Sequence, residues 1–61
     1  MFTLKMFWVG GKKFVKVENW NSGKLVAEAK AKELNKEVEV SFSNGVSTGY
    51  GLVQPNGTWS D

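Results

Sequence analysis

The sequence lacks both cysteine and histidine. Without cysteine, neither a disulfide framework nor a thiolate metal site can support a small core, and a secreted disulfide-rich scaffold is disfavoured. Without histidine, most zinc sites and the commonest general base are excluded as well. The titratable side chains that remain are carboxylates, lysines and Tyr50. The sequence therefore predicts a protein that is not an enzyme and that carries no metal and no cofactor.

Arginine and long apolar runs are also missing. All eight basic residues are lysines, and without the guanidinium fork the sequence-specific recognition of nucleic acid is disfavoured. No apolar stretch approaches the roughly 20 residues of a transmembrane helix. The N-terminal stretch is interrupted by Lys5 and is too short for a signal peptide. We therefore expect a cytoplasmic protein without a membrane contact.

The composition indicates one small globular domain over residues 1–61. Hydrophobic residues make up 41% and charged residues 23% of the chain. A domain of this size buries only about 60% of its unfolded surface, so we expect marginal stability and no deep cleft. The net charge of +2 is unevenly spread. Residues 1–24 are basic, with five lysines, whereas residues 37–61 hold three acidic residues and no lysine.

Residues 1–20 predict a hairpin that decides which side chains face a core. Gly10-Gly11 is expected to form its two-residue turn, because glycine supplies the positive φ that primed hairpin turns need. Side chains alternate along a strand, so this register separates two faces. The pairs expected on the core face are Met6 with Val15 and Leu4 with Val17. The pairs expected on the outward face are Phe7 with Phe14, Lys5 with Lys16 and Met1 with Trp20.

The second strand of this hairpin carries Lys12, Lys13 and Lys16. Charges of this kind suit the edge of a sheet, where they discourage pairing with other chains. We therefore expect this strand at an edge.

A helix is predicted from Gly23 to Leu34, where strong helix formers predominate. Asn21 or Ser22 is expected to cap its N-terminus through a side-chain oxygen, and Asn35 is expected just beyond its end. The residues expected to face the sheet are Val26, Ala27, Ala29 and Leu34, with Leu25 or Ala31 flanking them. Because alanine side chains are short, such a helix can lie close to a sheet.

A second hairpin is predicted around Asn44-Gly45, the strongest short hairpin signal. In the register that this turn sets, Tyr50 and Leu52 point outward, while Gly49 and Gly51 leave room beneath the helix. A register slipped by one residue stays open, and it would bury Tyr50 and Leu52. An outward Tyr50 should titrate near the ordinary tyrosine pKa of about 10.

The end of the chain predicts a turn followed by a tail. Residues 54–57 combine proline, asparagine and glycine in a turn pattern. In the remaining residues, Trp59 is expected to fold back onto an open end of the core.

Hairpin, helix and hairpin together predict an α+β fold of the order ββαββ. It is expected to be a four-stranded mixed sheet with one helix packed across one face, because the helix provides the crossover that parallel neighbours require. The first and last strands would lie side by side in the strand order 2-1-4-3. This order resembles the β-grasp plan of the small immunoglobulin-binding domains of protein G. The resemblance concerns the order of elements alone and implies no function or binding site.

The outward face of the sheet is the candidate functional surface. Its predicted binding residues are Phe7, Phe14, Lys5, Lys16, Tyr50 and Trp20, with Leu52 beside Tyr50. Contiguous exposed apolar surface of this kind usually marks an interaction site. Three interpretations stay open: cross-strand pairs that only stabilise the sheet, a stacking platform for single-stranded RNA or DNA, and a protein-binding face with aromatic anchors.

The charges favour the protein-binding interpretation. Nucleic-acid affinity rests on several phosphate contacts, and a chain of net charge +2 with Glu37 and Glu39 on the same sheet offers few of them. The sequence thus predicts a small protein-binding module, either an adaptor or an inhibitor of the kind that small phage or plasmid proteins often are. The alternative is a protein that binds single-stranded RNA or DNA through the same face. We expect an unidentified protein partner, and a monomer or weak dimer.

Overall fold

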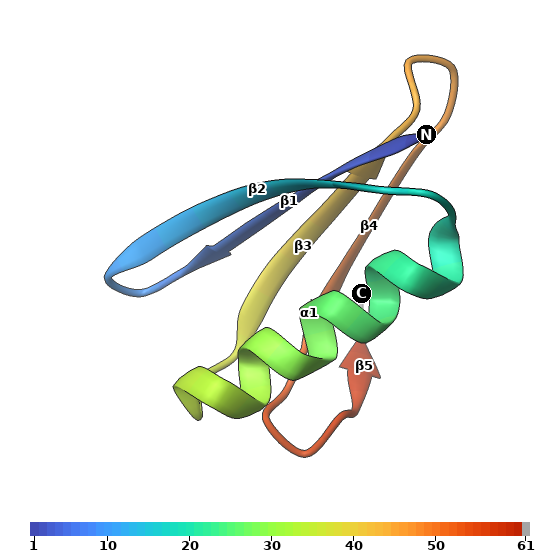
Figure 1. The fold of residues 1–61 in the computed structure, drawn as a ribbon. Helices are drawn as coiled ribbons and strands as arrows, with labels where there is room; N and C mark the ends of the chain where they lie inside the picture. Colours follow the sequence, from blue (N-terminus) through green and yellow to red (C-terminus); the bar gives the residue numbers. More distant parts are fainter. Residues whose placement is uncertain (61) are drawn as a thin grey trace.

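The computed structural model describes residues 1–60 and shows a small α+β fold, as the sequence predicted. The elements in chain order are β1 (Phe2–Trp8), β2 (Gly11–Val17), α1 (Trp20–Leu34), β3 (Val38–Ser43), β4 (Thr48–Val53) and β5 (Trp59–Ser60). Figure 1 shows the helix lying across one face of a twisted sheet, and no helix or strand of residues 1–60 lies over the other face. This uncovered face, on the side away from α1, is called the outer face below.

The sheet differs from the predicted one in its strand number, strand order and direction. It has five strands in the order β2-β1-β3-β4-β5, and every neighbouring pair is antiparallel. The four-stranded mixed sheet with the order 2-1-4-3 was therefore wrong. The predicted order fails because β4 pairs with β3 along one edge and with β5, near the end of the chain, along the other. A strand has only two edges, so β4 cannot also lie between β1 and β3.

The first hairpin turns one residue earlier than predicted. Trp8 pairs with Gly11 around the turn residues Val9 and Gly10, and among these four only Gly10 takes a positive φ, of 104°. Each residue of β1 therefore pairs with a β2 residue two positions earlier than predicted, so that Leu4 lies opposite Val15 rather than Val17. Because side chains alternate with a period of two, the two faces of the hairpin stay as predicted.

The second hairpin has a longer loop than predicted, from Asn44 to Ser47. The Asn44 Oδ1 accepts hydrogen bonds from the N–H groups of Val46, at 2.9 Å, and Ser47, at 2.7 Å. The central pair is therefore Gly45-Val46, with Gly45 at a φ of 90°. This register again differs by two positions from the predicted one, so Tyr50 still points outward. The alternative register that would have buried Tyr50 and Leu52 was wrong.

The helix begins earlier than predicted, at Trp20, because Asn19 caps it. The Asn19 Oδ1 accepts a hydrogen bond of 2.9 Å from the Ser22 N–H, so neither Asn21 nor Ser22 is the cap. The predicted end was confirmed, since Asn35 follows Leu34 in the left-handed conformation.

The face that α1 turns to the sheet was only partly predicted. Its buried residues are Gly23, Ala27 and Ala31, at a spacing of four. Ala27 was predicted correctly, Leu34 is half-buried against the core, and of the two alternatives for the flanking position Ala31 is buried and Leu25 is exposed. Val26 and Ala29 are exposed, which contradicts the prediction for them. The sheet-facing stripe is thus made of residues even smaller than expected, and the helix lies close to the strands.

The core lies between α1 and the sheet. Its buried members, apart from the two helix alanines, are Leu4, Met6, Val17, Val38, Val40, Phe42 and Val53. Val15, predicted to be buried, is half-buried and packs against this cluster. Trp59 also packs against the core, as predicted, but it does so as part of β5, opposite Val53. Its Nε1 donates a hydrogen bond of 2.6 Å to the Glu28 carboxylate.

Candidate functional site

The outer face carries aromatic residues, lysines, one acidic residue, one leucine and small polar residues. They come from alternate positions of four strands: Thr3, Lys5 and Phe7 of β1; Lys12, Phe14 and Lys16 of β2; Glu39, Ser41 and Ser43 of β3; Thr48, Tyr50 and Leu52 of β4. The other alternate positions of these strands face the helix. The strand pairing therefore arranges the outer face in rows that run across the sheet.

Phe7 and Phe14 form an exposed aromatic pair at the β1–β2 end of this face. Their ring centroids lie 5.7 Å apart in an edge-to-face arrangement. Phe7 is 37% exposed and Phe14 is 51% exposed. The two residues were predicted to lie directly opposite each other, but in the observed register they touch along a diagonal. Diagonal neighbours on an antiparallel pair stay within reach of aromatic side chains.

Two lysines approach the ring of Phe14. The Nζ of Lys5 lies 5.7 Å from its centroid, and the Nζ of Lys12 lies 5.8 Å from it. At this range an ammonium group is attracted to the face of an aromatic ring. Lys16 lies on the same face, opposite Thr3 and one alternate position beyond Phe14. The predicted residues Lys5 and Lys16 thus lie on the same face as the aromatic pair. The contact of Lys12 with the Phe14 ring was not predicted from the sequence.

Tyr50 lies on the outer face but apart from the aromatic pair. One row of the sheet runs from Tyr50 through Ser41 and Lys5 to Phe14, so two strands separate the two aromatic residues. The Tyr50 hydroxyl donates a hydrogen bond to the Glu39 carboxylate. This hydrogen bond raises the pKa of Tyr50 above its ordinary value, with smaller contributions from desolvation and from the charge of Glu39. The prediction that an outward Tyr50 would titrate with an ordinary pKa was therefore wrong.

Trp20 is not on the outer face. As the first residue of α1 it lies on the helix side of the sheet, with its ring 4.1 Å from that of Phe42 and 6.4 Å from that of Phe2. The predicted pairing of Met1 with Trp20 was wrong because β2 ends at Val17 and the chain has already turned into the helix. The signal that could have placed Trp20 correctly is Asn19, a strong N-cap residue directly before it.

The charges of the outer face change sign across the sheet. Its lysines stand on β1 and β2, whereas Glu39 stands on β3, directly opposite Phe7. Glu37, just before β3, accepts a hydrogen bond from the Gln54 side chain. Phe7 is consequently flanked by Lys12 on one side and by Glu39 on the other.

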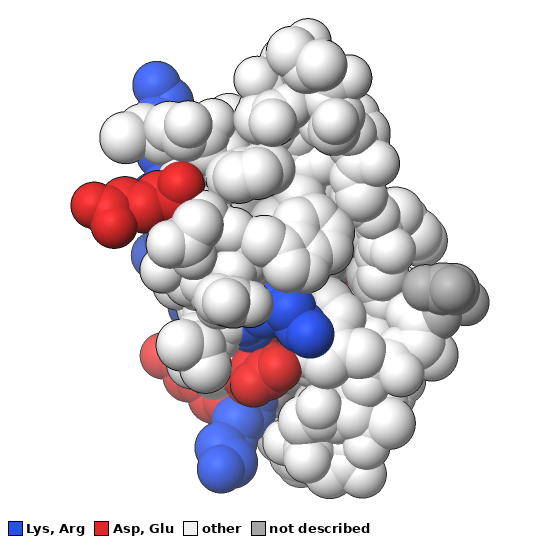
Figure 2. Space-filling model, turned by 90° about the vertical axis from the view of Figure 1, so that its right-hand side faces the viewer, with Lys and Arg blue, Asp and Glu red and all other residues white. Residues whose placement is uncertain are grey.

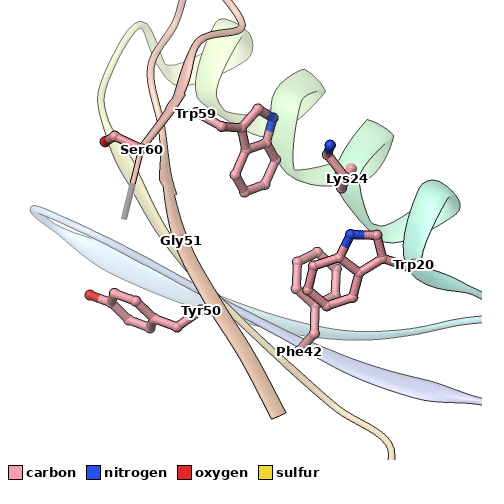
Figure 3. A pocket seen from close by; sticks show the side chains of 7 residues that line it. All are labelled: Trp20, Lys24, Phe42, Tyr50, Gly51, Trp59 and Ser60. Atoms are coloured by element: carbon pink, nitrogen blue, oxygen red, sulfur yellow. The ribbon is translucent and has the colours of Figure 1, made fainter. Parts of the chain in front are cut away.

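A groove on the helix side was not predicted from the sequence. It has a volume of about 270 Å³ and lies between α1 and β4, with Trp20, Lys24, Phe42 and Trp59 among its lining residues. Figure 3 shows the Lys24 side chain between the two indoles, while Tyr50 projects to the other side of β4. The lining residues of α1 and those of the strands are at least 18 positions apart in the chain, from Lys24 to Phe42. Such a groove can be found only once the strand order is known.

Among residues 1–60, no group of three or more acidic residues lies close enough together to hold a metal ion. No helix within this part of the chain is long and apolar enough to cross a membrane. Neither a protein-family model, nor a curated protein, nor a solved structure matches this chain.

Proposed function

We propose that this protein is a small non-enzymatic binding module, an adaptor or an inhibitor, that contacts another protein through the outer face of its sheet. The observation that carries the proposal is the exposed pair Phe7–Phe14 on a sheet face that no element of residues 1–60 covers. Aromatic residues surrounded by polar and charged side chains are the usual composition of a protein-binding surface.

The arrangement of charges supports a protein partner rather than a nucleic acid. Lys12 and Glu39 lie on opposite sides of Phe7, so the same anchor is bordered by both signs of charge. A protein surface can complement such a pattern with charges of its own, which sets specificity and the rate of association. A phosphate backbone would gain from the lysines and be repelled by the carboxylate.

One observation favours single-stranded RNA or DNA as the second candidate. Lys5, Lys12 and Lys16 all stand on the outer face beside exposed phenylalanine rings, as a stacking platform requires. However, Lys5 and Lys12 approach the ring of Phe14 itself, and Phe7 meets it edge-to-face. A base that stacked on Phe14 would have to displace these side chains, so this candidate ranks second.

The first experiment uses the protein as bait in a nuclease-treated lysate and compares wild type with Phe14→Ala. The control is Val46→Ala, which truncates a 93% exposed apolar residue at the tip of the β3–β4 loop. Wild type and the control should retain the same protein. Phe14→Ala should weaken the purified complex by more than about 1 kcal/mol, mainly through faster dissociation. If Phe14→Ala and Val46→Ala retain the partner equally, the outer face is not the contact surface.

The second experiment tests the nucleic-acid alternative with labelled single-stranded RNA and DNA of mixed sequence. If the outer face recognises protein, the oligonucleotides should bind it weakly and with almost no preference between RNA and DNA. If the oligonucleotides instead bind tightly at low salt and are released by about 200 mM salt, counterion release dominates the affinity. Loss of that binding in Lys5→Gln and Lys12→Gln would then replace the proposed function with the second candidate.

A further inference from the structure

The β4 strand has an open edge over part of its length. Within residues 1–60, β5 pairs only with Leu52 and Val53 of β4. The Gln54 N–H points toward the β5 side, since it donates a hydrogen bond of 2.8 Å to the Thr58 carbonyl. Because backbone groups alternate in direction along an antiparallel strand, the N–H and C=O of Thr48 and Tyr50 point to the same side. They face the stretch of the edge that β5 does not cover.

The two edges of the sheet differ in their protection. The other edge strand, β2, carries Lys12, Lys13 and Lys16, which discourage the addition of another strand. The open stretch of β4 is Thr48–Gly51, which holds two glycines and no charge. An uncharged edge is the one that can accept a further strand.

Beside this open edge, on the helix side, lies an apolar hollow in two adjoining parts. One part has a volume of about 270 Å³ and the other of about 300 Å³, and Trp20 and Phe42 line both. The glycines of β4 make room for the indoles that line it, since a Cβ on Gly49 would lie 2.3 Å from Cη2 of Trp20 and a Cβ on Gly51 would lie 3.2 Å from Cε3 of Trp59. The indoles therefore rest directly on the backbone of β4.

Lys24 is the charged residue that lines this hollow. Its Nζ lies 5.7 Å from the centroid of Trp59, and Figure 3 shows its side chain directed between the two indoles. The ion pair found within residues 1–60 joins Lys30 and Glu33, so Lys24 has no carboxylate partner in this part of the chain. Figure 2 shows this side of the molecule with charges gathered toward one margin and in a small cluster near the centre, and with the remainder uncharged.

We propose that the open edge of β4 binds an extended segment of another protein as an added antiparallel strand. Its main chain would form hydrogen bonds with the N–H and C=O groups of Thr48 and Tyr50. The segment would run in the same direction as β5, which is antiparallel to β4. Residues of the segment that face the helix side would place apolar side chains against Trp20 and a carboxylate near Lys24. The ligand class is thus an apolar and acidic extended peptide. This site is separate from the aromatic pair of the outer face and does not depend on it.

The test uses the whole protein labelled with ¹⁵N and a blocked peptide of about seven residues, a usual strand length. The peptide alternates threonine with valine and has glutamate at its central valine position, and a matched peptide has lysine there. At up to about 1 mM peptide, the glutamate peptide should shift the amide signals of Thr48 and Tyr50 and slow their hydrogen exchange. The amides of Lys12 and Lys16, at the other edge, should stay unchanged.

Two pairs of variants make the test specific. Thr48→Pro removes an N–H that points to the open edge and leaves the β3 ladder intact, so the glutamate peptide should bind about tenfold more weakly. Thr48→Val keeps the N–H and should bind as wild type does. Lys24→Gln should weaken binding of the glutamate peptide about two- to fivefold and should not weaken binding of the lysine peptide, because the substitution removes a like charge there. Lys32→Gln removes an exposed charge elsewhere on α1 and should change neither.

Several results would overturn the proposal. These are equal shifts at the two sheet edges, equal affinity of wild type for the glutamate and lysine peptides, and no shift at all. The proposal would also fail if sedimentation shows a wild-type dimer that Thr48→Pro dissociates, because the occupant of the edge would then be a second copy of this chain. Phe14→Ala should bind the glutamate peptide as wild type does, because Phe14 is not part of the β4 edge. The proposed edge site can therefore be confirmed or overturned independently of the proposed outer-face function.

Discussion

Gly23→Ala tests how closely α1 lies on the sheet. In an exposed helix interior this substitution stabilises a protein by about 1 kcal/mol, because alanine is the better helix former. Here a Cβ on Gly23 would lie 2.3 Å from Cε1 of Phe42 and 3.2 Å from Cγ2 of Val17. Phe42 is 1% exposed and its ring centroid lies 4.1 Å from that of Trp20, so a shift of the Phe42 ring would disturb its packing against Trp20.

The two effects can be compared in magnitude. Overpacking a tight core costs about 1–3 kcal/mol, and a contact this short at a buried ring places Gly23→Ala toward the upper end of that range. After subtraction of the helix-propensity gain, the free energy of unfolding should fall by about 1–2 kcal/mol. Asn21→Ala, two residues earlier and on the exposed side of α1, should instead raise the free energy of unfolding by a few tenths of a kcal/mol.

Urea unfolding followed by far-ultraviolet circular dichroism measures these changes, with the slope m as a check on two-state behaviour. Phe42→Leu supplies the second arm of a double-mutant cycle, because the smaller side chain leaves space for the new methyl group. Gly23→Ala should cost at least about 1 kcal/mol less in that background than in wild type. A stabilising Gly23→Ala in the wild-type background would refute the close helix-to-sheet packing.

Three further predictions follow from buried and hydrogen-bonded residues. Leu4→Ala should lower the free energy of unfolding by about 2–5 kcal/mol in a urea titration, because Leu4 is fully buried; an equal loss in Phe14→Ala would mean that the two sheet faces are reversed. Asn19→Ala should cost about 0.5–2 kcal/mol in the same assay through loss of the cap, and an unchanged midpoint would show that Asn19 does not cap α1. The ultraviolet titration of Tyr50, the one tyrosine, should give a pKa above the ordinary value of about 10 in wild type and a lower pKa in Glu39→Gln. Since the pKa is raised in the folded state, the stabilisation from this hydrogen bond should be complete below pH of about 10 and be lost as the pH rises through the folded-state pKa; equal pKa values in the two proteins would contradict the bond.

The local alternation of the strands was predictable from the sequence, and the turns were predictable only approximately. Both hairpins were placed correctly, yet each register is shifted by two positions. At the first turn only Gly10 requires a positive φ, so Gly11 is free to begin β2. At the second, the Asn44 side chain holds two backbone N–H groups and lengthens the loop. A shift of two preserves the faces, which is why Phe7 and Tyr50 were still placed correctly.

The strand order could not be predicted because it depends on contacts between distant segments. Both β3 and β4 place only uncharged residues on the helix side, so alternation alone does not decide which of them lies beside β1. The choice depends on β5, a strand of only two residues. Its tryptophan packs over Gly51 and occupies the far edge of β4. Such a short strand has no periodicity for sequence analysis to detect.

The helix face was misjudged for a related reason. Leu25 and Val26 are the most apolar residues in the first half of α1, and hydrophobicity alone assigns them to the core. The structure buries Ala27, as predicted, but beside it Gly23 rather than Val26, because the Phe42 ring packs directly against the helix backbone at Gly23. The size of the available space, rather than the hydrophobicity of the helix residues, decides which side of the helix faces the strands.

The outer face and the open edge of β4 share Tyr50. The distance from this edge to Phe14 is small enough for one partner to contact both. The side chain of Tyr50 lies on the outer face, while its backbone N–H and C=O face the open edge. Neighbouring strands are about 4.8 Å apart, so an added strand beside β4 would lie about 19 Å from β2 and Phe14. A typical protein interface covers about 800 Å² on each partner, which spans that distance. If a single partner uses both surfaces, Phe14→Ala and Thr48→Pro will each weaken the same complex. If two partners are involved, each substitution will affect one complex and leave the other unchanged.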